Sequence, residues 1–209
     1  MVDYITTNEL KTALPDGSVA TTYDTFLNYL VTTVSRCIDR FTKRHNDAFA
    51  VASATTRYFT GNGERVLDVD EMAAAPTAVA VAEAGDIDDA SGTGGDYTTW
   101  ASSDYLLWPY NAPDLDLPYS ALEIDVLNGT KWVWYRYPKA VKITAKWGYS
   151  EAAPEAIKHA CIIQAARWFK RGQQAYMDDS AYTDFGVITI KQLDPDVANI
   201  LQHYIRTVI

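Results

Sequence analysis

Apolar residues near the start of the chain recur at helical spacing. Between residues 21 and 45 they lie three or four positions apart, which places them on one stripe of a long amphipathic helix. The stripe consists of Tyr23, Phe26, Leu27, Leu30, Val34, Cys37, Ile38 and Phe41. A shorter helix is predicted at 6–11, and Leu14-Pro15-Asp16-Gly17 ends it.

From about residue 50 to 149 the pattern changes to alternation of apolar and polar positions, as in half-buried strands. Strands are predicted at 55–60, 65–70, 77–81, 122–126 and 141–147. The first two flank Gly61-Asn62-Gly63-Glu64, so we expect them to form a hairpin.

Turn-forming residues divide the rest of this region. Asn128-Gly129 predicts a turn that leads into the aromatic run Trp132–Tyr135. Residues 85–96 are rich in Gly, Asp and Ser, and residues 109–118 contain three prolines. Both segments are predicted to be exposed loops.

Helical spacing returns at Pro154, which suits the first position of a helix. Apolar residues cover more than half of this helix, so we expect it to be largely buried. A short strand is predicted at 185–190. Asp194-Pro195 then opens a last helix, whose apolar face is Val197, Ile200, Leu201, Tyr204, Ile205 and Val208.

The order of elements predicts an α+β fold. About three main helices and a short N-terminal one form an α-helical bundle from residues 1–49 and 150–209. An antiparallel β domain, residues 50–149, is inserted between the first two long helices. The chain has 209 residues, of which 48% are apolar, so one domain with a large insertion is expected.

Charge is unevenly distributed along the chain. Between Gly61 and Val126 there are 14 acidic residues and one basic residue, a net charge of −13, whereas the remainder carries +4. A surface that grips phosphates would be basic, so this stretch is expected to repel nucleic acid. Acidic loops also keep a protein in solution, and that alternative stays open.

No stretch reaches the roughly 18–20 apolar residues that a membrane span needs. The start of the chain lacks a signal-peptide pattern, so a protein made in a cytoplasm is expected. Cys37 and Cys161 both fall in predicted helices. In a reducing compartment they are interpreted as small buried apolar residues.

Catalytic and metal-binding patterns are hard to find. His45, His159 and His203 have no partner at metal-ligand spacing, and nucleophile-elbow, phosphate-loop and dinucleotide-binding motifs do not occur. The segment from Asp86 resembles the opening of a calcium loop, but its fifth, sixth and twelfth positions are Ala90, Ser91 and Tyr97, which breaks the pattern. We therefore expect neither a metal nor another cofactor.

Two weaker functional alternatives remain at this point. Paired carboxylates such as Asp68 with Asp70, or Asp114 with Asp116, would be needed for a hydrolase. Single-stranded DNA binding would need a basic groove beside aromatic residues. Lys139, Lys142 and Lys146 are predicted on one strand face, but the neighbouring acidic surface argues against such a groove.

A combination of segments resembles a known family. It includes Ser35–Thr42 at the end of the long helix and Thr56–Gly61 at the start of the β region. It continues with the strand Val141–Tyr149, the helix that runs from Pro154 to Arg171, and Leu193–Val197. In this order the segments resemble the head–tail connector (adaptor) proteins of tailed bacteriophages. Residues 77–119 match nothing typical of that family.

The resemblance implies a structural, non-enzymatic ring subunit, with 12 copies as the usual number. It would lie in the virion, at the head–tail interface, after assembly in the host cytoplasm. Its partners would be copies of itself, the portal protein and a stopper or tail protein. Double-stranded DNA would pass through the central channel without specific binding.

Two groups of residues are candidates for these contacts. Because connectors of this type commonly meet the portal through their C-terminal segment, Leu201, Tyr204, Ile205 and Ile209 are predicted to contribute, with packing inside the chain as the alternative. Asp86, Asp88, Asp89 and Asp96 are predicted to form an acidic loop at the channel. A competing hypothesis is a monomeric carbohydrate- or protein-binding module that uses Trp100, Trp108, Tyr110 and residues 132–137, since exposed aromatic rings stack on sugars.

Overall fold

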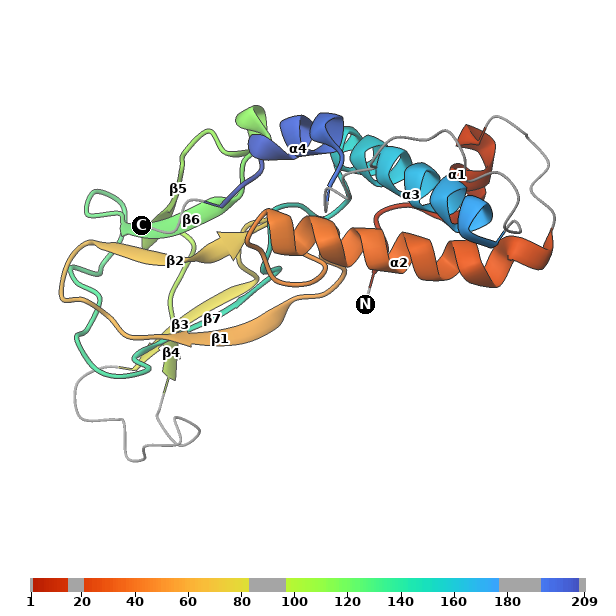
Figure 1. The fold of residues 1–209 in the computed structure, drawn as a ribbon. Helices are drawn as coiled ribbons and strands as arrows, with labels where there is room; N and C mark the ends of the chain where they lie inside the picture. The colour runs from red at the N-terminus through yellow and green to blue at the C-terminus, as the bar shows by residue number, and fades with distance from the viewer. Residues whose placement is uncertain (1, 15–20, 83–96, 177–192, 207–209) are drawn as a thin grey trace. The chain divides into compact units, whose positions relative to one another are not determined.

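The chain forms two compact units, one helical and one built of β-strands. The computed structural model describes residues 2–14, 21–82, 97–176 and 193–206. Residues 1–49 and 153–209 make up the helical unit, and residues 50–152 make up the β unit (Figure 1). The predicted α+β class, with helices on both sides of an antiparallel β insertion in the sequence, is confirmed.

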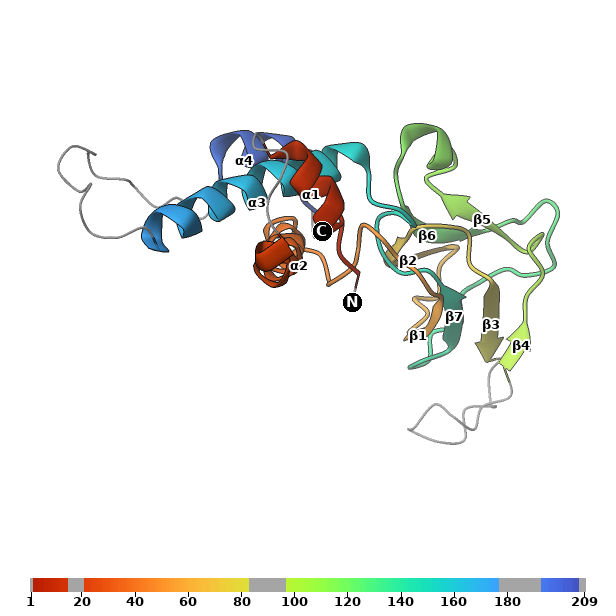
Figure 2. The ribbon, with the colours of Figure 1, turned by 90° about the vertical axis from the view of Figure 1, so that its right-hand side faces the viewer.

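The helical unit is assembled around its longest helix. Its helices are α1 (Thr7–Ala13), α2 (Asp24–Phe41), α3 (Glu155–Tyr176) and α4 (Pro195–Gln202), with a 3-10 turn at Thr21–Tyr23. Helix α3 packs against each of the other three helices. Figure 2 shows α2 almost end-on, with α3 running beside it. None of the helices in the described part of the chain is long and apolar enough to cross a membrane.

Side-chain caps set the starts of α1 and α4. The Thr6 hydroxyl accepts a hydrogen bond from the Glu9 N–H, and Glu9 accepts one from the Thr6 N–H, which together form a capping box. Asp194 caps α4 by accepting a hydrogen bond from the Asp196 N–H, and Pro195 occupies the first helical position. Both starts agree with the sequence prediction.

The buried stripe of α2 differs from the predicted one. Leu27, Leu30, Val34 and Ile38 are buried as expected, but Phe26, Cys37 and Phe41 are only half-buried. Val31, Ser35 and Asp39 are buried instead. The buried face is therefore turned toward two polar residues, because the N-terminal segment lies against that side of the helix.

The β unit contains two antiparallel sheets. The first sheet has the order β1-β7-β3-β4, and the second has the order β2-β6-β5 (Figure 2). The strands are β1 (Thr55–Phe59), β2 (Val66–Met72), β3 (Ala78–Ala82), β4 (Tyr97–Thr99), β5 (Tyr105–Trp108), β6 (Tyr119–Ile124) and β7 (Val141–Ala145). Strands β1, β2, β3, β6 and β7 were predicted, whereas β4 and β5 were not.

One core cluster is shared by the inner faces of both sheets. Val79, Val81, Val141 and Ile143 come from the first sheet, and Leu67, Leu122 and Ile124 come from the second. The rings of Trp100 and Trp134 stack in the same cluster, with their centroids 4.6 Å apart. Along β7 the buried residues alternate with Lys142 and Thr144, as the period-two pattern predicted.

The predicted hairpin between 55–60 and 65–70 is wrong. Strand β1 pairs with β7 and strand β2 pairs with β6, so the two strands belong to different sheets. The Gly61–Glu64 segment instead lies against the chain around Trp134: the Gly63 N–H donates to the Trp134 carbonyl, and the Trp134 N–H donates to the Glu64 carbonyl. Gly61 permits a close backbone approach, because a Cβ atom there would lie 2.0 Å from the Tyr135 carbonyl oxygen, and Gly63 has a positive φ of 81°.

Other predictions in the β region had mixed outcomes. Residues 132–135 form no strand, although they follow the predicted turn at Asn128-Gly129. Segment 109–118 is a largely exposed connection with a 3-10 turn at Pro113–Leu115, as expected. The predicted loop at 85–96 and the strand predicted at 185–190 lie outside the described residues.

Candidate interaction surfaces

The C-terminal segment that was predicted to meet a partner is partly buried in the helical unit. Leu201 is fully buried, whereas Tyr204 and Ile205 are half-buried. Ile209 lies outside the described residues. Intramolecular packing, the alternative left open by the sequence, therefore applies to Leu201 in this conformation.

Hydrogen bonds tie the residues after α4 to the end of α2. The Arg44 guanidinium donates to the Tyr204 carbonyl, and the Arg206 N–H donates to the Thr42 carbonyl at 2.9 Å. The Tyr204 ring meets Phe49 edge-on, with the centroids 5.7 Å apart. Residues 204–206 are thus held by contacts within the helical unit.

The four aspartates of the predicted acidic loop, Asp86, Asp88, Asp89 and Asp96, lie outside the described residues, as does most of the segment that resembles a calcium loop. His45, His159 and His203 are exposed. Among the residues that the structure describes, no group of three His, Cys, Asp or Glu side chains is arranged to hold a metal ion.

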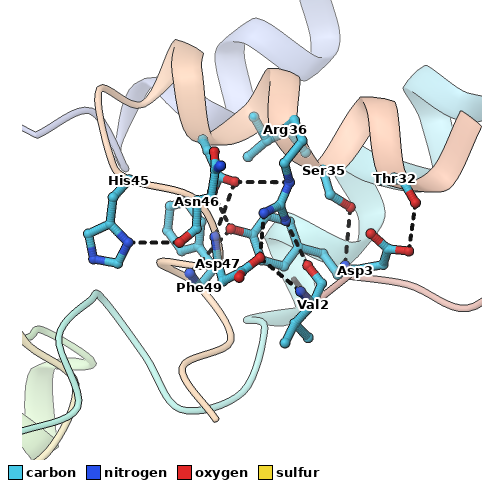
Figure 3. A network of polar contacts seen from close by, with 12 residues as sticks. Val2, Asp3, Thr32, Ser35, Arg36, His45, Asn46, Asp47 and Phe49 are labelled. Carbon is cyan, nitrogen blue, oxygen red and sulfur yellow. Dashed lines mark hydrogen bonds and ion pairs between the residues drawn. The ribbon is translucent and has the colours of Figure 1, made fainter. Parts of the chain in front are cut away.

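A buried polar network holds the N-terminal segment against α2 (Figure 3). The Tyr4 hydroxyl donates to the Asp39 carboxylate, and the Tyr4 N–H donates to the Ser35 hydroxyl at 3.2 Å. Arg36 donates to Asp47 and, at 2.6 Å, to the Val2 carbonyl, while the Val2 N–H donates to Asp47 at 2.8 Å. Val2 and Tyr4 are therefore held in place by hydrogen bonds of their backbone atoms and of the Tyr4 side chain.

The network perturbs the titration of its members. Burial raises the pKa of Asp39, against the opposing effects of the Tyr4 hydroxyl and the Arg36 guanidinium. Burial also raises the pKa of Tyr4, and the bond to Asp39 adds to the effect. Perturbed acids mark catalytic sites or structural networks. Because the groups of this network bond to one another and to backbone atoms, we interpret the network as structural.

Sequence reasoning missed this network, although a signal was present. Ser35 and Asp39 continue the spacing of Val31 at steps of four, on a side of α2 that the predicted stripe did not include but that is buried in the structure. Gln164 on α3 is a second case: it is buried, and its side chain accepts a hydrogen bond from the Asp194 N–H at 3.0 Å. A buried polar residue needs a partner, and here the partners are remote in sequence.

The two cysteines form no disulfide with each other. Both are free thiols; Cys161 is buried as predicted, and Cys37 is half-buried. The Cys161 sulfur lies 3.8 Å from the Ser35 hydroxyl. Burial raises the pKa of the Cys161 thiol to about 12, which disfavours the reactive thiolate.

The aromatic residues proposed for a carbohydrate site divide into two groups. Trp100 and Trp134 are buried in the core of the β unit, so the suggestion that they stack on a sugar is wrong. Trp108, Tyr110, Trp132 and Tyr137 are exposed. Exposed aromatic surface therefore remains, but it comes from two separate segments of the chain.

The outer face of the β2-β6-β5 sheet is unusually apolar. Along one row, Val66 and Leu106 flank Glu123, and along the next, Asp68 and Trp108 flank Ala121. Tyr110 covers the same face, because its hydroxyl donates to Glu123 and its ring meets that of Trp108 edge-on. We call this set, Val66, Asp68, Leu106, Trp108, Tyr110 and Glu123, the apolar face.

Exposure of the apolar face is substantial. Val66, Leu106, Trp108 and Tyr110 retain 40, 41, 47 and 52% of their accessible surface. Antiparallel sheets with one face in water normally direct polar side chains outward. A contiguous group of exposed apolar side chains is typical of an interaction site.

The outer face of the β1-β7-β3-β4 sheet has a different character. Thr56 and Tyr58 of β1 lie beside Thr144 and Lys142 of β7, and the Lys142 ammonium lies 5.5 Å from the centre of the Tyr97 ring. No described residue that these four strands direct outward is acidic. We call the set Thr56, Tyr58, Tyr97, Lys142 and Thr144 the lysine face. Lys139 was predicted on the same strand but precedes it, and it has a positive φ of 57°.

No known sequence family and no curated protein sequence matches this chain. Solved structures do share its fold. A chain in the neck of an empty gene transfer agent (GTA) particle, computed with C6 symmetry, superposes with a TM-score of 0.54 at 15% sequence identity, covering 99% of this chain and 91% of that one. A chain in the virion of a native gene transfer agent particle superposes with a TM-score of 0.50 at 16% identity, with the same coverage.

These likenesses extend over both units of the chain. At such low identity they show a common fold, and the contacts of the particle chains belong to those chains. The matched stretch, 99% of this chain, also takes in β3, β4 and β5, a region where the sequence matched nothing typical of a family.

Proposed function

We propose that this protein is a structural head–tail connector subunit, which assembles into a ring in the neck of a phage-like particle. Copies of the chain contact one another around the ring, the portal protein binds on one side, and a stopper or tail protein binds on the other. Double-stranded DNA passes through the central channel. The ring contains 12 copies, the usual number in the family that the sequence resembles.

The observation that carries the proposal is the likeness of fold over 99% of the chain to a chain in the neck of a particle. Two further features support it. The β unit exposes an apolar sheet face, which a ring would cover. The polar groups of Tyr4, Arg36, Asp39 and Asp47 bond to one another and to backbone atoms within the chain, which suits a structural protein.

The acidic stretch fits a channel wall. Residues 61–126 carry a net charge of −13, and a wall of like charge leaves a DNA duplex free to slide. We propose that Asp86, Asp88, Asp89 and Asp96 contribute to that wall. Tyr204, Ile205 and Ile209 are proposed to contribute to portal binding, with Leu201 supporting them from inside the helical unit.

The proposal is tested by deleting the gene in the strain that produces the particle. Heads are expected to assemble and fill with DNA but to remain unjoined to tails, and the intact gene supplied from a plasmid is expected to restore joining. Counting tailed and tailless heads by electron microscopy provides the measurement. Normal numbers of tailed, DNA-filled particles without this protein would refute a connector role.

A monomeric binding module is the competing function, and exposed Trp108 and Trp132 favour it. Such a module predicts a monomer at every concentration, both alone and with the portal protein. It also predicts saturable binding of an oligosaccharide that is lost in Trp108→Ala or Trp132→Ala. Binding of this kind without self-association would favour the module over the connector.

A further inference from the structure

The two outer faces of the β unit are complementary in chemistry. The apolar face presents Leu106, Trp108 and Tyr110 around the acidic residues Asp68 and Glu123. The lysine face presents Tyr58 and Lys142 on a surface of threonine and alanine. An acidic, apolar surface and a basic, aromatic surface of the same fold are suited to each other.

We propose that the apolar face of one copy packs against the lysine face of the next copy in the ring. This inference rests on the proposed function and specifies its self-contact. A ring with cyclic symmetry needs two different surfaces on each subunit, because every copy meets one neighbour with one surface and the other neighbour with the second. The β unit carries such a pair.

Small residues make the lysine face able to receive bulky side chains. Ala78 and Ala80 of β3 lie beside Thr144 and Lys142, so β3 itself adds little bulk to this face. Tyr58 and Tyr97 stand together, with ring centroids 6.2 Å apart. In the proposed contact, Trp108 and Leu106 of the neighbouring copy pack beside Ala78 and Thr144, and Asp68 and Glu123 approach Lys142.

The proposed contact includes more than the sheet faces. A specific interface buries about 800 Å² on each partner, which is more than a few side chains supply. Leu115 and Leu117, in the connection that follows β5, are exposed by 60 and 45% and extend the apolar surface along the chain. Interfaces are typically anchored by aromatic residues, which is the role assigned to Trp108.

Two interface variants and one control allow a strict test. The apolar-face variant carries Leu106→Lys and Trp108→Lys, and the lysine-face variant carries Tyr58→Glu and Lys142→Glu. Tyr29, exposed by 68% on α2, provides the control variants Tyr29→Lys and Tyr29→Glu. Circular dichroism and thermal unfolding are recorded for every variant, so that only folded chains are compared.

Sedimentation velocity is measured for each chain over a range of concentrations, alone and with the portal protein. Wild type and both Tyr29 variants are expected to form rings, whereas each interface variant alone is expected to stay monomeric. An equimolar mixture of the two interface variants is expected to associate again, as dimers or as larger assemblies in which the variants alternate. In the mixture the intact apolar face of one variant meets the intact lysine face of the other, and the substituted faces, lysine against glutamate, are also opposite in charge.

Charge exchange gives a second test with milder changes, should the double variants fail to fold. Asp68→Lys and Lys142→Glu are each expected to weaken association at least about tenfold, because like charges then face each other. Combining the two in one chain is expected to recover part of the loss. Both residues lie on the solvent-facing side of their strands, so folding should be little affected.

The outcomes separate this inference from the connector role. If wild type and all variants form rings equally well, the assignment of the two faces is wrong and the ring stands. If the wild-type chain forms no ring under either condition, the proposed function fails together with the inference. A mixture that shows no association although its components are folded would also overturn the pairing of these faces.

Discussion

At the scale of single residues, buried polar groups hold together segments that are remote in the chain. Tyr4 reaches Asp39 across 35 positions, and Asp104 holds Thr130 across 26. Such bonds contribute modestly when both partners are present and cost considerably more when one partner is removed. Two predictions follow from these two sites.

Tyr4→Phe removes the hydroxyl that donates to Asp39. The buried carboxylate then lacks its best donor, so the free energy of unfolding is expected to fall by about 1–3 kcal/mol. Urea unfolding followed by circular dichroism measures the change. Tyr29→Phe, at an exposed position of α2, is the matched control and should leave stability within about 0.5 kcal/mol. An equally small effect at Tyr4 would contradict a stabilising role for the network.

Asp104 gives a prediction about pH. Its carboxylate accepts hydrogen bonds from the Thr130 and Ala101 N–H groups, each at 2.9 Å, and the Thr130 bond is the main cause of its lowered pKa. A carboxyl group with a lowered pKa stabilises the fold above its unfolded value, about 3.9, and this contribution is lost as the pH falls through the folded value. Asp104→Asn should therefore destabilise by about 1–2 kcal/mol near neutral pH.

The difference between wild type and Asp104→Asn is expected to shrink as the pH drops below about 4. Urea unfolding at a series of pH values, with exposed Asp114→Asn as the control, isolates the contribution of Asp104. A difference that stays constant from neutral to acid pH would show that the ionised carboxylate is not the stabilising species.

At the scale of elements, the sequence predicted most helices and strands but not how the strands pair. Local spacing and caps defined α1, α2, α3 and α4, because helical hydrogen bonds and capping are local. Strand pairing depends on contacts that are distant in sequence. Glycines between β1 and β2 suggested a hairpin, yet those strands belong to different sheets.

Contacts distant in sequence also limited the prediction of the candidate surfaces. The four residues of the C-terminal segment were predicted from the resemblance to connector proteins, but the hydrogen bonds of Tyr204 and Arg206 to the end of α2 were not predicted. The apolar face was not predicted either, because β5 was not recognised as a strand. Without its pairing to β6, Leu106 and Trp108 could not be placed on the same side as Val66.

Gly61→Ala tests the packing between the Gly61–Glu64 segment and the aromatic run. A Cβ atom at this position would lie 2.0 Å from the Tyr135 carbonyl oxygen, a backbone atom that cannot move away by rotation. The free energy of unfolding is expected to fall by about 1–3 kcal/mol. Gly172→Ala in α3 is a suitable comparison, since its nearest contact is the end of the Phe26 side chain at 3.0 Å.

Thermal and urea unfolding of both glycine variants provide the measurement. Gly61→Ala is expected to be clearly the less stable of the two, because alanine also favours the helix at Gly172 by roughly 1 kcal/mol. Equal stability of Gly61→Ala and wild type would mean that residues 61–64 and 134–135 do not approach as described.

At the scale of the whole molecule, the proposed function requires exposed surfaces that other chains can cover. An apolar sheet face, a complementary lysine face and a strongly acidic stretch occur in one chain of 209 residues. The fold is shared with a chain in the neck of a particle that was computed with cyclic symmetry. Each of these features is consistent with a ring around a DNA channel.

Imaging the purified chain with its portal protein by electron microscopy tests this account most directly. We predict closed rings that bind one end of the portal, share its axis and contain a whole number of copies related by cyclic symmetry. A chain that stays monomeric and leaves the portal bare would contradict the account.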